Sequence, residues 1–374
     1  MKLKNVRIVT LNDVLENHTI EVENGFIKSI MPTLFSDSGV DGHGAIVMPG
    51  FIDTHIHGAA GADVMDATPE ALETISQAIL QEGTTRFCPT TMTMDTTSIL
   101  NALKNAAKAQ VSGAQIEGIH LEGPFISPTY PGAQNPIYIE KGTIEALDVF
   151  ISASRQSIRL MTFAPEEHDA SFIEHAQSQG IVCSIGHSNA SEEHVALAHA
   201  LGVRQRTHFF NAMRPLHHRD CGVVGMSLLQ DDVICEVIAD RVHSSDYALK
   251  LIAKLKPEHI NLITDSISAK YLDDGRYSLG GLDIEVKNGI ARTLSGALAG
   301  STLRMDQALK NMHILAGWSL NACAYAASTR PAMTLKKDAV LGQLAPGFLA
   351  DMVLLNDNLD VLKVYVAGEL KYTR

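Results

Sequence analysis

The sequence has few aromatic residues, few charged residues and no long apolar stretch. Aromatic residues make up 5% and charged residues 19% of the 374 residues, whereas hydrophobic residues reach 45%. No stretch of about 18 apolar residues predicts a membrane span, and no apolar segment of the signal-peptide kind follows the charges of the first seven residues. We therefore expect no membrane partner. A chain of this length and hydrophobic content favours one large domain and a small one.

Positive charge is also scarce. The chain has 30 lysines and arginines against 42 acidic residues, a formal net charge of −12, and its basic residues form no run and no stripe with interleaved aromatics. This composition argues against a nucleic-acid partner. The phosphate-binding pattern GxxxxGK[ST] does not occur, so nucleotide chemistry of the P-loop kind is not indicated. An anionic substrate would need a local cluster of positive groups.

Cysteine is present but not in a pattern that predicts a disulfide framework or a thiolate metal site. The number of cysteines is odd and no CxxC spacing occurs. Most of them lie in apolar, strand-like runs, which is typical of buried reduced thiols in a cytoplasmic protein. The five are Cys88, Cys183, Cys221, Cys235 and Cys323.

Both ends of the chain predict β-structure. Asn24-Gly25 is a strong two-residue hairpin signal between two apolar runs, and Ala367-Gly368 marks a similar turn near the end of the chain. We predict that residues 1–48 and 341–374 meet in one small β-sandwich domain, which leaves residues 49–340 as a separate catalytic domain.

The middle of the chain alternates strand and helix patterns. Eight short apolar runs predict strands at 51–57, 84–88, 116–121, 158–163, 181–185, 206–210, 234–239 and 260–263. Helical patterns lie between them at 69–82, 97–109, 170–179, 192–200 and 246–255. This is the count that a (β/α)8 barrel of the TIM type needs. A doubly wound open sheet would also alternate, but polar residues at so many strand ends favour a closed barrel. An insertion at 271–294 predicts β-hairpins, and helices follow from 301 to about 328.

Six polar residues come at the ends of these runs, where the strands of a barrel converge on one mouth. Each has an alternative explanation, as a strand-end polar residue, a solvated loop residue, a surface histidine or, for the aspartate, a helix cap. Their shared placement favours a common site. The six are His55, His57, Glu122, His187, His208 and Asp265.

These residue types suit metal-dependent hydrolysis. Glu122, His187 and His208 give three protein ligands with a position left for water, as in catalytic zinc sites. A metal there lowers the pKa of its water towards neutrality. Asp265 is placed to take a proton from that water and return it to a leaving amine. Arg219, after a strand end, could bind a substrate anion or be a surface charge.

Together these segments resemble the N-acetylglucosamine-6-phosphate deacetylase family of the amidohydrolase superfamily. The resemblance covers essentially the whole chain. The motifs that carry it are Pro49-Gly-Phe-Ile-Asp-Thr-His-Ile-His-Gly58, His120-Leu-Glu-Gly-Pro-Phe125, Gly186-His-Ser188, Thr207-His-Phe-Phe-Asn-Ala-Met213, Leu216-His-His-Arg219, Ile263-Thr-Asp265 and Leu298-Ala-Gly-Ser-Thr302.

The resemblance implies deacetylation of N-acetylglucosamine 6-phosphate in amino-sugar catabolism, on a (β/α)8 barrel with a small β-sandwich, and a homodimer with sites near the interface. Glu122, His187 and His208 would hold the principal metal, His55 and His57 a second one, and Asp265 would act as base and then acid. Substrate contacts would come from Ala133, Gln134, Asn211, Ala212, Arg219, His243, Leu298, Ala299 and Gly300. The ion would be Zn²⁺, with Fe²⁺, Co²⁺ and Mn²⁺ as alternatives.

Two departures from the family bear on the substrate. The family commonly has histidine where this chain has Gln134, and Asp-Gly-x-His where it has Asp240-Arg-Val-His243. Gln134 can donate a neutral hydrogen bond to the acetyl carbonyl but cannot carry charge. N-acetylgalactosamine 6-phosphate is therefore an alternative substrate. A dihydroorotase or hydantoinase would usually bring a modified strand-end lysine, which is missing, and a non-catalytic sugar-phosphate sensor would have lost ligands or the aspartate.

Overall fold

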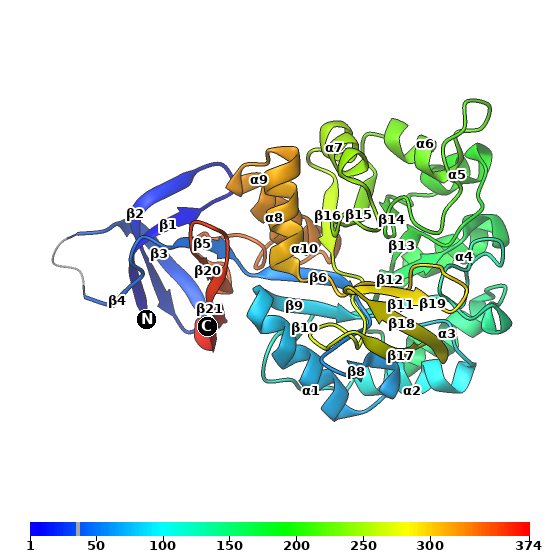
Figure 1. The fold of residues 1–374 in the computed structure, drawn as a ribbon, viewed down its shortest axis with the longest axis horizontal. Helices are drawn as coiled ribbons and strands as arrows, with labels where there is room; N and C mark the ends of the chain where they lie inside the picture. Colours follow the sequence, from blue (N-terminus) through cyan, green and yellow to red (C-terminus); the bar gives the residue numbers. More distant parts are fainter. Residues whose placement is uncertain (35–37) are drawn as a thin grey trace.

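The computed structural model describes residues 1–34 and 38–374. Residues 35–37, which belong to the predicted segment 1–48, lie outside the described part of the chain. Both termini lie in a lobe of strands at one end of the molecule, and the alternating strands and helices form the larger body beside it (Figure 1). None of the helices in the described ranges is long and apolar enough to cross a membrane.

Strands from both termini belong to one sheet, as the sequence predicts. β20 pairs antiparallel with β5, which joins the last strands of the chain to the first ones. Hydrogen bonding joins these strands in one sheet, and the isolated bridge Phe26↔Leu349 connects the start of β3 to the residues just before β20. The strands are β1 (Lys2–Val9), β2 (Val14–Glu23), β3 (Phe26–Pro32), β4 (Val40–Asp41), β5 (Ile46–Pro49), β20 (Met352–Leu355), β21 (Val361–Val366) and β22 (Glu369–Thr373).

The two predicted hairpin turns are confirmed. Asn24 and Gly25 have φ of 51° and 82°, and Ala367 and Gly368 have φ of 47° and 78°. Two consecutive residues with positive φ match the right-handed twist of the flanking strands, which is why Asn-Gly is favoured there.

The larger body contains a curled set of parallel strands. β9 pairs with β6 and β10, and six further strands pair in chain order from β11 to β16. Isolated parallel bridges connect the two sets, Thr90↔His120 on one side and Ile56↔Ser266 on the other. The strands are β6 (Phe51–Ile56), β9 (Thr84–Pro89), β10 (Gln115–Ile116), β11 (Ile119–Glu122), β12 (Ile158–Phe163), β13 (Val182–Ile185), β14 (Gln205–Arg206), β15 (Ile234–Ile238) and β16 (Ile260–Ile263).

Two of the predicted strands differ from the observed ones for backbone reasons. The strand expected at 116–121 is divided at Gly118, whose φ of 147° suits glycine alone. The strand expected at 206–210 ends at Arg206, because the backbone turns into the left-handed region at His208, with φ of 30°, and at Phe210, with φ of 81°.

Helices alternate with these strands and cover them. The predicted helix at 69–82 is α1 followed by a 3-10 turn, Ile79–Glu82. The sequence did not predict α3 or α6. The helices are α1 (Pro69–Ala78), α2 (Thr96–Ala106), α3 (Ile144–Ala153), α4 (Ala170–Ser178), α5 (Glu192–Ala200), α6 (Gly222–Leu229), α7 (Asp246–Leu255), α8 (Met305–Ala316), α9 (Leu320–Ala324) and α10 (Arg330–Thr334).

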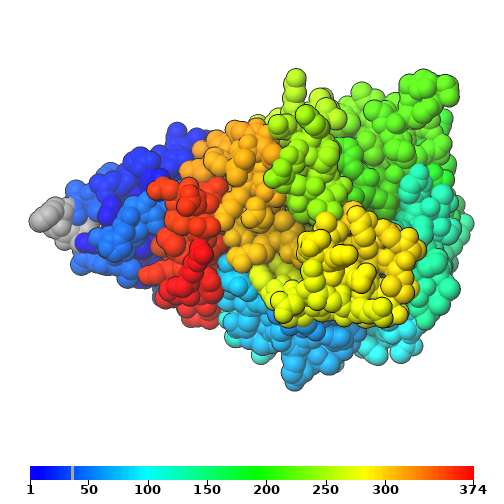
Figure 2. Space-filling model, viewed as in Figure 1, coloured from blue at the N-terminus to red at the C-terminus, as the bar shows by residue number. Residues whose placement is uncertain are grey.

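The insertion at 271–294 forms the predicted hairpins. Its strands β17 (Gly275–Leu279), β18 (Leu282–Lys287) and β19 (Ile290–Thr293) pair antiparallel and bury a small apolar core with Met92 and Ile267. In Figure 2 the yellow segment that contains these strands covers part of the visible face of the larger body.

Candidate active site

The predicted site residues meet at the carboxyl ends of the parallel strands. His55 lies in β6 and His57 directly after it, and Glu122 is the last residue of β11. His187, His208 and Asp265 each come two residues after a strand end. All six side chains are buried. Residues far apart in sequence thus converge because parallel strands present their carboxyl ends on one side of the sheet.

Three of these residues depart from ordinary strand geometry. His187, His208 and Asp265 have φ of 47°, 30° and 49°, in the left-handed region that non-glycine residues seldom adopt. Such conformations persist where the surrounding structure enforces them, and they cluster at functional sites. Asp265 does not cap a helix, because the next element after it is β17 and the next helix, α8, begins only at Met305, so its alternative explanation is excluded.

Glu122, His187 and His208 form the first group that could hold a metal ion. His208 Nε2 lies 3.0 Å from His187 Nε2 and 3.1 Å from Glu122 Oε1, and His187 Nε2 lies 3.3 Å from the same carboxylate oxygen. His187 Nδ1 contacts the Tyr130 carbonyl at 3.0 Å. Since a carbonyl only accepts, Nδ1 carries the hydrogen and the Nε2 lone pair faces the group. Lone pairs this close repel unless a cation or a proton lies between them, so the donor set fits a metal ion.

His55, His57 and Glu122 form a second group of the same kind. The two Nε2 atoms lie 3.3 Å apart, and His57 Nε2 is 3.2 Å from Glu122 Oε2. His57 Nδ1 contacts the Thr90 carbonyl at 3.2 Å, which again directs the Nε2 lone pair inwards. Glu122 therefore joins the two groups: its Oε1 faces His187 and His208 and also lies 3.5 Å from His55 Nε2, and its Oε2 faces His57. We call them the first and the second ion position.

Asp265 lies against the second ion position. Its Oδ1 is 3.1 Å from His57 Nε2 and 3.4 Å from His55 Nε2. Burial by itself raises its pKa, but the charge of His55 and the hydrogen bond of His57 outweigh burial and lower the pKa to about 2. The carboxyl is therefore ionised at neutral pH, as a proton acceptor must be.

The electrostatics of the whole group favour bound positive charge. Burial raises the pKa of Glu122, yet the charge of His55 and hydrogen bonds from His187 and His208 hold it well below its usual range. Burial lowers the pKa of His57, but Asp265 and Glu122 raise it to about 9. A cation and protons therefore compete for the same lone pairs, as they do at metal sites generally.

A cavity of about 450 Å³ opens above these groups. Most of the predicted site residues line it, together with Met92, Thr129, Tyr130, Pro131, Gly132, Leu279 and Ala297. The predicted residues in its lining are His57, Glu122, Ala133, Gln134, His187, His208, Asn211, Ala212, His243, Asp265, Leu298 and Gly300.

Three predicted site residues lie outside this lining. His55 is fully buried beneath it, and the Ala299 side chain is buried with its backbone nitrogen bonded to Ala291. Arg219 is exposed, and its guanidinium contacts His218 Nε2 at 2.7 Å. The structure therefore does not bring Arg219 into the lining of this cavity, and its contact with substrate stays a prediction.

Sequence reasoning missed some of the lining. Tyr130 and Pro131 precede the Gly132-Ala-Gln134 stretch, and that closeness was an available signal. Leu279 comes from the hairpin insertion, which no sequence pattern connected with the site.

The fold and the site together are typical of one class of hydrolases. In that class, histidine and carboxylate side chains that can bind a metal ion gather at the carboxyl ends of parallel strands. The pattern of the amidohydrolase family matches residues 46–371. The chain belongs to the amidohydrolase family, which makes it a hydrolase acting on an amide, and the resemblance drawn from its motifs is confirmed.

Individual relatives agree with this assignment. An N-acetylgalactosamine-6-phosphate deacetylase of Escherichia coli O157:H7 is 36% identical over 97% of both chains. An N-acetylglucosamine-6-phosphate deacetylase of Lysinibacillus sphaericus is 36% identical over 99% of this chain and 97% of the relative. The crystal structure of the Thermotoga maritima N-acetylglucosamine-6-phosphate deacetylase superposes with a TM-score of 0.90, at 34% identity over the full length of both chains.

Proposed function

We propose that this chain removes acetate from N-acetyl-D-glucosamine 6-phosphate to give D-glucosamine 6-phosphate. The observation that carries the proposal is the convergence of Glu122, His187 and His208 beside Asp265 on the floor of one cavity. Relatives named N-acetylglucosamine-6-phosphate deacetylase match nearly the whole chain. A further solved relative, from Mycobacterium smegmatis, was crystallised as a mutant with N-acetyl-D-glucosamine 6-phosphate and has a TM-score of 0.94 at 29% identity, over 100% of this chain and 99% of that one.

The ion positions would hold one or two divalent ions, zinc first, with Fe²⁺, Co²⁺ or Mn²⁺ as alternatives. Such an ion polarises a carbonyl and makes a coordinated water nucleophilic near neutral pH. Asp265 would accept the proton of the attacking water and return it to the sugar amine as acetate leaves. Asp265 is placed for both steps because it is buried against the second ion position and lines the cavity.

The remaining lining residues would hold the phosphosugar. Asn211, Ala212 and His243 line one part of the cavity, and Ala133, Gln134, Leu298 and Gly300 another. Arg219 would reach a phosphate only from outside its own cavity, which is consistent with a homodimer whose sites lie near the interface. A cytoplasmic location is consistent with the five free thiols, four of them buried.

The architecture behind this site would be a closed (β/α)8 barrel spanning 49–340, with a small β-domain from 1–48 and 341–374. The bridges Thr90↔His120 and Ile56↔Ser266, which join the two parallel strand sets on both sides, support closure. An experimental structure that showed an open edge at either bridge would contradict it.

The test is acetate release by purified, metal-analysed protein, with the gluco and galacto 6-phosphosugars assayed side by side. Preference for N-acetylglucosamine 6-phosphate is expected. Preference for N-acetylgalactosamine 6-phosphate would make that sugar the substrate instead. The Escherichia coli relative is named for a deacetylase of that sugar. No release from either sugar with metal bound would show that the reaction is wrong.

A further inference from the structure

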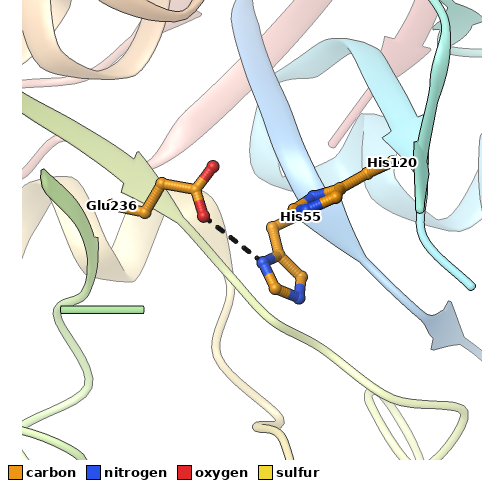
Figure 3. A group of neighbouring side chains, drawn as sticks. All are labelled: His55, His120 and Glu236. Carbon is orange, nitrogen blue, oxygen red and sulfur yellow. Dashed lines mark hydrogen bonds and ion pairs between the residues drawn. The ribbon is translucent and has the colours of Figure 1, made fainter. Parts of the chain in front are cut away.

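A third group of buried donor atoms lies beneath the second ion position. His55, His120 and Glu236 place one nitrogen or oxygen each within 4.8 Å of the others, and all three are fully buried. Figure 3 shows the His55 ring next to the Glu236 carboxylate, with His120 beside it. Two imidazoles and a carboxylate could hold an ion of their own, so the hydrogen bonds of each member decide what the group does.

His120 has no free lone pair for an ion. Its Nδ1 contacts the Thr54 carbonyl at 3.0 Å, so that nitrogen carries the hydrogen. Its Nε2 contacts Thr162 Oγ1 at 2.7 Å and accepts from that hydroxyl. Both ring nitrogens are therefore used within the protein, and the group is not a third ion position.

Glu236 has one oxygen anchored and the other directed at His55. Its Oε1 accepts from Gln205 Nε2 at 2.8 Å and from Thr54 Oγ1 at 3.2 Å. Its Oε2 lies 3.4 Å from His55 Nδ1, and this imidazole is its ion-pair partner within the described residues. A fully buried carboxylate that is held by neutral donors and one imidazole is costly to maintain, which calls for a role.

We propose that Glu236 is a positioning residue that sets the affinity of the second ion position. By accepting from His55 Nδ1, it fixes the hydrogen on that nitrogen and turns the Nε2 lone pair toward His57 and Glu122. A carboxylate behind a ligating histidine also raises the basicity of the ring. This inference rests on the proposed metal site. The first ion position is independent of Glu236, because the Tyr130 carbonyl orients His187.

The experiment measures ion binding by Glu236→Gln in the full-length protein. The glutamine has nearly the same shape and can still accept from His55, but it carries no charge. Zn²⁺ binding to chelated protein is followed by calorimetry and elemental analysis, and Co²⁺ binding by its visible absorption. The binding phase, meaning the step of the titration, that disappears in His57→Ala is assigned to the second ion position. In Glu236→Gln this phase is expected to weaken by about 10–100-fold, while the first phase and its Co²⁺ spectrum remain.

Two further variants separate positioning from a general loss of structure. Ser184→Ala removes a buried hydroxyl from the neighbouring strand β13, where it bonds Thr207 and none of His55, His120 or Glu236, so binding at both ion positions is expected to stay unchanged. Glu236→Asp keeps the charge at a shorter reach, and it is expected to recover part of the affinity that glutamine loses. It also serves as the test if the glutamine variant does not fold.

The outcomes distinguish this inference from the proposed function. Equal binding of the second ion by wild type and Glu236→Gln would overturn the role of Glu236, as would a wild type that binds one ion only. A wild type that binds two ions, with the second weakened in Glu236→Gln, but releases acetate from neither sugar would contradict the proposed deacetylase while the role of Glu236 stands.

Discussion

Gln134 donates its side-chain amide to Glu122 Oε2 at 2.8 Å. The amide is held in this orientation because its oxygen accepts from the Thr93 backbone at 2.7 Å, so the nitrogen must face the carboxylate. Gln134, at the position where the family commonly has histidine, thus orients the Glu122 carboxylate, which joins the two ion positions. The resemblance alone implied a contact with the acetyl carbonyl.

We predict that Gln134→Ala lowers turnover by about 10–100-fold, because one hydrogen bond to a buried charged group is worth about 1.5–3 kcal/mol. Gln134→His, which restores the common family residue, is expected to stay active. Asn135→Ala is the control, since its side chain caps a short turn next to the site. Steady-state acetate release measures all three. Wild-type turnover in Gln134→Ala would contradict the predicted role.

Asp265→Asn should abolish most turnover. Losing a positioned acid and base typically costs about 10²–10⁴-fold, and asparagine cannot take up the proton. Metal content is expected to be unchanged at the first ion position, because Asp265 contacts His55 and His57 rather than His187 or His208. Asp274→Asn, at an exposed residue directly before β17, is the matched surface control. Near-normal acetate release would remove Asp265 from the mechanism.

Glu122→Gln should impair both ion positions, since its carboxylate contacts the histidines of both. After dialysis the variant is expected to retain less than one ion per chain by elemental analysis. His57→Ala is the comparison, and it should lose the second ion only. Retention of the wild-type amount of metal by Glu122→Gln would show that this carboxylate is not a ligand.

Removing metal with a chelator should lower the melting temperature. An ion that binds the folded chain alone stabilises it by about 4 kcal/mol at 1,000 times its Kd. Removal would also leave buried lone pairs facing each other at 3.0 Å. Scanning calorimetry with and without added Zn²⁺ measures the shift, and Glu122→Gln should respond much less. An unchanged melting temperature would argue against a resident ion.

Arg219→Ala should raise KM with little change in kcat, provided that the arginine binds the substrate phosphate. The expected rise is about 10-fold or more, the value of a hydrogen bond to a charged group. Because Arg219 lies outside its own cavity, sedimentation should show a dimer in solution. Arg276→Ala, on the hairpin, is a comparable surface control. An unchanged KM would assign Arg219 to the surface.

Much of the architecture follows from local sequence. The spacing of apolar residues predicts most of the strands and helices of the larger body, because side chains return to the same face every two residues in a strand and every 3.6 residues in a helix. Asn24-Gly25 and Ala367-Gly368 predict the two hairpin turns, since consecutive positive φ angles favour these residues. The sequence also indicated the metal-binding residue types, because each of them follows an apolar run.

Only the tertiary structure shows which of these side chains lie within contact distance of one another in one site. Glu122 joins the two ion positions, Arg219 stays outside the cavity, and Leu279 enters it from a distant hairpin. Glu236 is the clearest case. In sequence it is one acidic residue inside an apolar strand, and only the packing of β15 beside β14 and β16 brings its carboxylate to His55. Such contacts depend on the orientation of side chains that lie 181 residues apart in the sequence, which no local pattern encodes.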